Sequence, residues 1–249
     1  ALEDDLMRLF GGEWISALME RMGWSDDDPI EHPRLTAAIQ RAQEKVEARN
    51  FEIRKQVLEY DDVMNKQREA IYALRKSVLA GENLKQMTAD TIASVAEGLV
   101  RAHADEKMAS SYWNVEALES EVAALLNAPG RPQLYHEGMG WRDLVKAVEE
   151  LIRKAHAARE ALFGDERMRD LERAVMLYLI DSKWVDHLQA MDMLREGIGL
   201  RAYGQQDPLV EYKYEAYEAF QAMVHSIKED VVRYILRVKV VEKPQERQI

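Results

Sequence analysis

The stretch "LTAAIQRAQEKVEARNFEIRKQVLEYDDVMNKQREAIYALRKSV", residues 35–78, decides the fold of this chain. Residues spaced by threes and fours form one unbroken stripe through it, the pattern of a helix with a single contact face. Neither Gly nor Pro interrupts the stretch. We therefore expect one helix that ends just before Gly81. At about 1.5 Å per residue, a helix of about 45 residues is a rod of roughly 70 Å, about twice the width of a small domain, so it cannot be buried in one core.

The stripe of this helix is apolar at most positions and polar at Asn50 and Gln67. Its apolar members are Ile39, Val46, Ile53, Val57, Tyr60, Met64, Ile71 and Leu74. The two polar members have two interpretations, which both stay open here: they set the register, as polar residues do in coiled coils, or they contact a separate domain. The other faces carry Arg49, Arg54, Asp61, Asp62, Asn65 and Arg68. A charged helix face is usually only solvated.

Composition favours an all-α protein without disulfides. With 249 residues, the chain exceeds a typical domain of roughly 100–200 residues, so we expect two or three units or one extended helical assembly. Gly (12) and Pro (6) are scarce, and strand-forming runs are nearly absent. A net charge of −11 argues against general nucleic-acid binding. The absence of Cys excludes disulfides, thiolate metal ligands and cysteine nucleophiles.

No segment of the sequence predicts membrane insertion or targeting. The longest charge-free apolar run, "AVMLYLI" at 174–180, is far shorter than the roughly 20 residues of a spanning helix. We expect a soluble or at most peripheral protein. The chain opens with "ALEDDLMRLF", which has nothing ahead of it to pack against, so we expect a piece of a larger protein.

Further helices are expected on both sides of the long one. One runs from Glu3 to Met22 and precedes the connector "GWSDDDPIEHP". A smaller helical unit is expected over 83–164, with helices at 84–104, 115–126 and 141–162, the second capped by Asn114.

Two long helices then flank "REGIGLRAYGQQDP", residues 195–208, as an antiparallel hairpin. The first helix spans 166–196, and the second starts at Pro208 with Asp207 as N-cap. The predicted stripe of the first helix is Leu171, Val175, Tyr178, Trp184, Leu188, Met191 and Leu194. The predicted stripe of the second is Tyr212, Ala216, Phe220, Met223, Ile227, Val231 and Tyr234.

Motifs of common catalytic and metal sites are missing from the sequence. There is no G-x-x-x-x-G-K-[ST] loop, and Gly197, Gly199 and Gly204 follow no strand. No histidine forms H-E-x-x-H or follows a Glu by three residues, and the His136–Glu137 pair starts a loop. We therefore expect neither catalytic residues nor a nucleotide, cofactor or metal site in this chain.

Four segments carry a family resemblance. "RNFEIRKQVLEYDDVMNKQR", residues 49–68, resembles the scaffold-helix signature of the SecA family, the ATP-driven motors of bacterial protein secretion. "LREGIGLRAYGQQDPLVEYKYEAYEAF", residues 194–220, resembles the two-helix finger of the same family. "LEDDLMRLF" is similar to the end of the second motor domain, and "EHPRLTAAIQRAQEKVEARN" to the run into the scaffold helix.

This resemblance implies a division of the chain. Residues 1–31 would end the second motor domain and connect it, 32–82 would be the scaffold helix, and 83–164 the helical wing. Residues 165–241 would be the finger and 242–249 a tail. The motor halves that bind ATP and Mg in the family have no counterpart here, and neither does the cysteine-rich zinc tail of many members. ATP hydrolysis would thus belong to the parent protein.

The resemblance also implies partners and site residues. The finger tip of the family touches the unfolded preprotein at the SecYEG channel through a tyrosine, which matches Tyr203. Gly204 would keep the turn tight, Arg201 would meet anionic lipid, channel loops or substrate, and Ile198 and Leu200 either join this contact or close the core of the hairpin. The scaffold face of Asn50, Arg54, Asp61 and Asp62 would dock the motor domains of the same polypeptide.

The implied location is the cytoplasm and the cytoplasmic face of the bacterial inner membrane. No nucleic-acid partner is implied, and the resemblance is compatible with a monomer and with a homodimer. Two other classes remain as alternatives. The first is a helical adaptor that binds partner helices and has only its coiled-coil-like stripes in common with the SecA family. The second is a helical metalloenzyme, which the missing ligand spacings disfavour.

Overall fold

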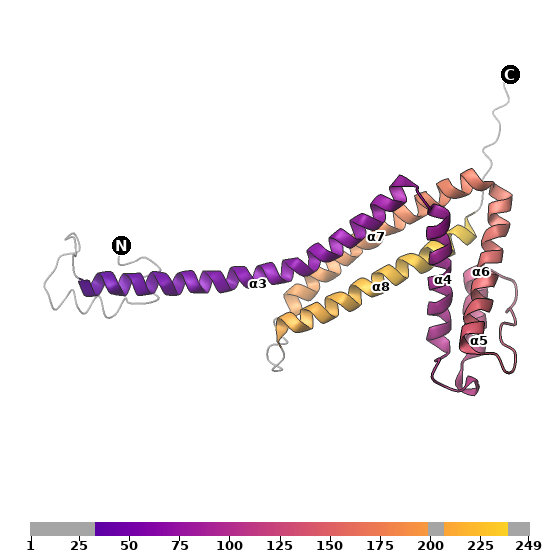
Figure 1. Ribbon diagram of the computed structural model, residues 1–249, viewed down its shortest axis with the longest axis horizontal. Helices are drawn as coiled ribbons and strands as arrows, with labels where there is room; N and C mark the ends of the chain where they lie inside the picture. The colour runs from indigo at the N-terminus through magenta and orange to yellow at the C-terminus, as the bar shows by residue number, and fades with distance from the viewer. Residues whose placement is uncertain (1–32, 199–206, 239–249) are drawn as a thin grey trace, which may run out of the picture. The chain divides into compact units, whose positions relative to one another are not determined.

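The computed structural model describes residues 33–198 and 207–238 of the chain (Figure 1). Within these residues every regular element is helical, which confirms the all-α fold. The elements are α3 (Pro33–Ala80), α4 (Leu84–His103), a 3₁₀ turn η1 (Ser110–Tyr112), α5 (Val115–Leu126), α6 (Trp141–Phe163), α7 (Asp165–Ile198) and α8 (Pro208–Arg237). The helix expected over residues 3–22 lies outside the described residues. No described helix has an apolar stretch long enough to cross a bilayer.

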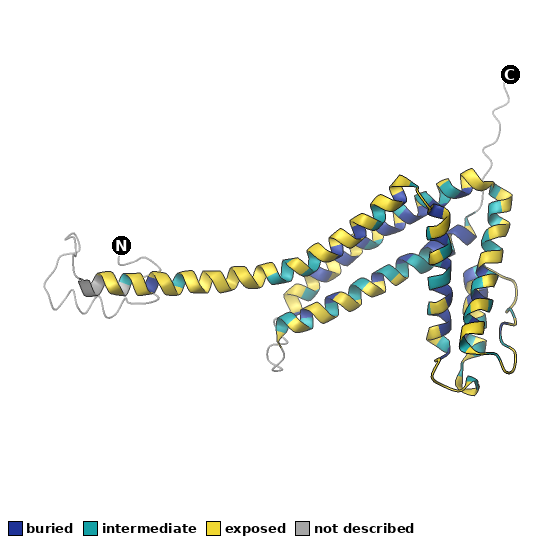
Figure 2. Ribbon diagram, in the orientation of Figure 1, coloured by how far each residue is buried: buried dark blue, intermediate teal, exposed yellow. Residues whose placement is uncertain are grey.

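The predicted long helix is confirmed as α3, which ends directly before Gly81. The chain divides into two units, residues 1–64 and 65–249. The described part of the first unit is the helical stretch 33–64, and most of its side chains are exposed (Figure 2). Ile53 and Val57, two members of the predicted stripe, are 50% and 41% exposed. Apolar contacts among the described residues therefore do not bury these two members of the stripe.

In the second unit, the end of α3 packs with α7 and α8. Ile71 and Val78 are the buried apolar residues of α3 here. α7 and α8 lie side by side (Figure 1). Lys183 of α7 pairs with Asp230 of α8, and His187, one turn later in α7, contacts Phe220, which precedes Asp230. Because residue numbers rise along α7 as they fall along α8, the two helices are antiparallel.

A second core of the same unit joins α4, α5 and α6. It also includes Val232 and Leu236 from the end of α8, so α8 contributes to both cores. Its other buried residues are Ile92, Val95, Ala96, Leu99, Val100, Ala104, Leu118, Val122, Leu125, Leu134, Leu144, Val148 and Ile152. The indole N–H groups of Trp113 and Trp141 donate to the carbonyls of Asp105 and Ala104, which fixes the loop after α4.

The prediction that two tyrosines lie on the buried stripes of α7 and α8 is wrong. Tyr178 and Tyr234 are 63% and 46% exposed, whereas Leu179 and Ile180 beside Tyr178 are buried. A stripe can advance by three or by four residues at each step, and here the chain buries the more apolar neighbours. α7 also buries more than one face, because it contacts α4 and α6 as well as α8.

Candidate functional site

The residues predicted to dock the motor domains lie on the part of α3 in the first unit. Asn50, Arg54 and Asp61 are separated by four and seven residues, so they share one face of the helix. Asn50, Arg54 and Asp62 are exposed, and Asp61 is half-buried. The exposed large apolar residues of the same stretch are Phe51, Ile53, Val57 and Leu58. Phe51 and Leu58 are seven residues apart and share one side of the helix, and neighbouring exposed apolar side chains are typical of a contact surface.

The predicted polypeptide contact belongs to the segment between α7 and α8. Leu200, Arg201, Tyr203 and Gly204 lie outside the described residues, so their role stays a prediction. Ile198, the last residue of α7, is only 3% exposed, which fits the alternative in which it closes the core of the hairpin. At the start of α8, Asp207 accepts a hydrogen bond from the backbone N–H of Leu209 at 2.9 Å. The N-cap predicted at Asp207 is confirmed.

Three helices meet at Gln67 of α3. Its Nε2 donates to the carbonyl oxygen of Ala216 in α8 at 2.9 Å, and its Oε1 lies 2.8 Å from Nε2 of His187 in α7. Gln67 and His187 are 7% and 5% exposed and are two of the four buried polar or charged residues in residues 33–198 and 207–238. This buried cluster of Gln67, His187 and the Ala216 carbonyl is called the junction below.

The imidazole of His187 lies between two aromatic rings. Its centroid is 5.5 Å from that of Trp184 and 5.8 Å from that of Phe220. Burial lowers the pKa of His187 below its ordinary value of 6.5, because the charged ring loses its hydration. At neutral pH the ring is therefore uncharged, with one donor nitrogen and one acceptor nitrogen.

Two ion pairs add to the contacts of α7. Arg75 of α3 donates from Nε and Nη2 to the two carboxylate oxygens of Asp181 at 2.8 and 3.1 Å. These side chains are 40% and 52% exposed. Lys183 of α7 lies 3.0 Å from the carboxylate of Asp230 in α8, and these two side chains are half-buried. Because solvent screens exposed charges, we expect the exposed pair of Arg75 with Asp181 to contribute little to stability.

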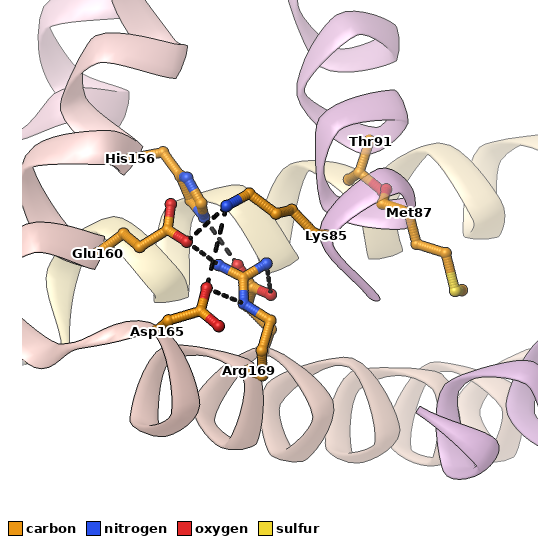
Figure 3. A network of polar contacts seen from close by, with 8 residues as sticks. Lys85, Met87, Thr91, His156, Glu160, Asp165 and Arg169 are labelled. Atoms are coloured by element: carbon orange, nitrogen blue, oxygen red, sulfur yellow. Dashed lines mark hydrogen bonds and ion pairs between the residues drawn. The ribbon is translucent and has the colours of Figure 1, made fainter. Parts of the chain in front are cut away.

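A second polar cluster lies where α4, α6 and α7 meet (Figure 3). Glu160, near the end of α6, accepts from Lys85 at 3.0 Å and from Arg169 at 3.1 Å. Lys85 and Arg169 each also lie 3.9 Å from Asp165. The hydrogen bond from Lys85 is the main reason why the pKa of Glu160 is lowered from its usual value. The charges therefore hold the start of α4 against the turn from α6 to α7.

Glu172 forms the buried side of this cluster. Its side chain is 0% exposed, and its Oε1 lies 2.7 Å from Nε2 of His156. Arg169 Nη1 is 2.7 Å from the other carboxylate oxygen, but the angles fall outside hydrogen-bond geometry. The carboxylate is thus held by one hydrogen bond and one close ion pair. A buried charge needs such partners because it has lost its hydration.

No metal site is formed by the described residues. Residues 33–198 and 207–238 contain no group of three or more His, Cys, Asp or Glu side chains that could hold a metal ion. His136 and Glu137, the pair noted in the sequence, are both exposed in the loop between α5 and α6.

The junction and the buried Glu172 were missed as sites by the sequence reasoning. Gln67 carried a signal, because it is a polar residue at an apolar position of the stripe. Glu172 carried a weaker one, since it lies between Leu171 and Val175 in a helix with two buried faces. Nothing in the sequence pairs Gln67 with His187, because 120 residues separate them.

Comparisons with known proteins give a consistent result. A family model described as the SecA Wing and Scaffold domain matches residues 29–239. The protein translocase subunit SecA of Pelotomaculum thermopropionicum is 52% identical over 250 residues, which cover 100% of this chain and 28% of that relative. The subunit of Syntrophomonas wolfei is 51% identical over 248 residues, 99% of this chain and 30% of the relative. The subunit of Desulforamulus reducens is 50% identical over 249 residues, which cover 99% of this chain and 28% of that relative. The chain spans less than a third of the length of these relatives.

Proposed function

We propose, from the premise that this chain belongs to the SecA family, that it is the scaffold, wing and finger part of a protein-translocating motor. The observation that carries the proposal is the match to the SecA wing and scaffold domain over residues 29–239. The identity of about half of the residues over the whole chain supports it. As in the division proposed from the sequence, residues 1–31 end a motor domain, 32–82 are the scaffold helix, 83–164 the wing, 165–241 the finger and 242–249 a tail.

The scaffold helix would receive the motor domains of the parent. These domains would bind ATP and Mg and hydrolyse ATP, while this chain supplies no catalytic residue. The exposed face with Asn50 and Arg54, beside the exposed Phe51 and Leu58, supports such a contact. Because a helix is stiff, a movement of the motor at one end can reach the other end. In the second unit, α3 contacts both α7 and α8 at the junction.

The finger would carry this movement to the polypeptide. Tyr203 would contact an unfolded preprotein at the SecYEG channel, because an aromatic ring with a hydroxyl group packs on apolar side chains and hydrogen-bonds to any backbone. Arg201, Gly204, Ile198 and Leu200 would shape the same tip, with anionic lipid as a further partner of Arg201. The motor would act at the cytoplasmic face of the bacterial inner membrane, either as a monomer or as a homodimer.

The test uses the full-length parent with reconstituted SecYEG channel. The double variant Asn50→Ala with Arg54→Ala should lower channel-stimulated ATP hydrolysis several-fold, because the motor loses part of its contact with α3. Arg41→Ala is the matched control, since Arg41 is an exposed α3 residue nine positions before Asn50, on the opposite side of the helix. Unchanged ATP hydrolysis in the double variant would remove the docking role. A parent without any channel-stimulated hydrolysis would refute the proposed function.

A further inference from the structure

Gln67 of α3 bonds to two helices at once. We propose that Gln67 is a positioning residue that fixes the axial register of α3 against the α7–α8 pair. Its amide uses both ends, with Nε2 donating to the Ala216 carbonyl of α8 and Oε1 facing Nε2 of His187 in α7. Both contacts are direct and buried.

The Ala216 carbonyl determines the orientation of the whole cluster. A carbonyl oxygen can only accept, so the NH₂ group of Gln67 must point to Ala216 and its oxygen to His187. The oxygen of Gln67 can also only accept, so His187 must carry a proton on Nε2. Every group at the junction thus has one defined role, and no alternative orientation of the amide satisfies both helices.

Apolar contacts alone would not fix the axial register of α3 against α7 and α8. The hydrophobic effect is non-directional, so Ile71 and Val78 of α3 could bury similar area after a shift of one helical turn, about 5.4 Å. The ion pair of Arg75 with Asp181 is exposed, and water can replace its partners. The same shift would leave the buried Gln67 amide and the His187 N–H unpaired. A single buried amide sets the register of coiled coils in the same way.

The register has a consequence for transport. If one register is much more stable than its neighbours, α3 does not slide gradually along α7 and α8 but moves with them or steps between discrete positions. This coupling role of Gln67 rests on the proposed function, whereas the register itself does not.

The test measures distances in the 249-residue chain. The chain has no Cys, so two introduced cysteines are its only thiols. Spin labels at Lys76 of α3 and Asp192 of α7, both exposed and offset along the helices, report axial shifts. The otherwise unchanged chain should give one narrow distance distribution. The double variant Gln67→Met with His187→Leu removes both partners, so it leaves no unpaired buried donor and should melt near or above the unchanged chain.

The double variant should nevertheless show a broadened distribution or a second distance shifted by about one helical turn, ~5.4 Å. A narrow, unshifted distribution would overturn the positioning role and leave a structural contact. The control Arg75→Met with Asp181→Leu removes the exposed ion pair and should keep the distribution narrow. Broadening in this control equal to that in the double variant would also overturn the proposal, because the register would then not depend on Gln67.

The same double variant in the full-length parent separates the register assignment from the coupling role in transport. If the register is lost and transport through SecYEG falls several-fold while ATP hydrolysis continues, Gln67 has the coupling role. If the register is lost and transport is unchanged, the coupling role is wrong and the register assignment stands. Absence of transport in the unaltered parent would instead refute the proposed function.

Discussion

The carboxylate of Glu172 in α7 lies 2.7 Å from the imidazole of His156 in α6, and the Glu172 side chain has no exposed surface. The two helices are consecutive and join at Gly164, so this contact and the pair of Arg169 with Glu160 of α6 fix the direction in which α7 leaves α6. A fully buried carboxylate at a helix junction is costly unless both oxygens face positive or donating groups. Neither partner can therefore be changed alone without loss.

The first prediction concerns this carboxylate. Glu172→Ala leaves the largely buried His156 without its carboxylate partner and Arg169 with only Glu160 and Asp165, so it should lower the free energy of unfolding by about 3–5 kcal/mol. Thermal and urea unfolding followed by circular dichroism measure the loss. The control is Asp165→Ala in the same cluster, where the side chain is 72% exposed and the change should stay within about 0.5 kcal/mol. Similar losses in both variants would show that burial of Glu172 does not govern its effect.

The second prediction concerns pH. Burial lowers the pKa of His187, so the unfolded chain takes up a proton at a higher pH than the folded chain does. The free energy of unfolding should therefore fall as the pH drops below about 6.5, by at most about 1.4 kcal/mol per pH unit, until the folded pKa is reached. Urea titrations between pH 7.5 and 5 measure it. His187→Leu should reduce this pH dependence, and the exposed His136→Gln should not. An unchanged pH profile in His187→Leu would contradict the assignment.

The third prediction concerns the turn between α3 and α4. Gly81 has φ +70°, and an added β-carbon would collide with the guanidinium of Arg173. Gly81→Ala should destabilise the chain by about 1–2 kcal/mol, the cost of a left-handed residue with a side chain. Gly130→Ala is the control, since nothing lies within 4 Å of its β-carbon position. It should be neutral or slightly stabilising, because alanine restricts the unfolded chain. A loss in Gly130→Ala as large as in Gly81→Ala would refute the reasoning.

The fourth prediction concerns Tyr203. If it is the preprotein contact, Tyr203→Ala should change the stability of this chain by no more than about 0.5 kcal/mol and still cripple transport by the full-length parent. Tyr203→Phe should keep part of the transport, because the bulk of the ring supplies most of the contact. Melting of the chain and translocation by the parent are measured for the same variants. Normal transport by Tyr203→Ala would remove the contact role, and a melting loss of many degrees would indicate a structural one.

Local signals predicted the elements of the fold well. The N-cap at Asn114 is confirmed by a hydrogen bond from Ala117 N–H, and the unbroken stripe predicted α3 almost to the residue. These features depend on neighbours a few positions away. The burial of Tyr178 and Tyr234 was predicted wrongly, because which face a helix buries depends on the helices that surround it. The partners of Gln67 and Glu172 could not be predicted at all, because they arise only when separate helices pack.

The sharing of α8 between two cores has a consequence for how the protein unfolds. Ala216 contacts Gln67 in the core with α3 and α7, while Val232 and Leu236 lie in the core of α4, α5 and α6. Neither core can lose α8 without exposing apolar surface of the other. The two cores should therefore unfold as one cooperative unit. Amide hydrogens in the middle of α4 and α7 would then exchange with solvent through the same global opening, although the two helices belong to different cores.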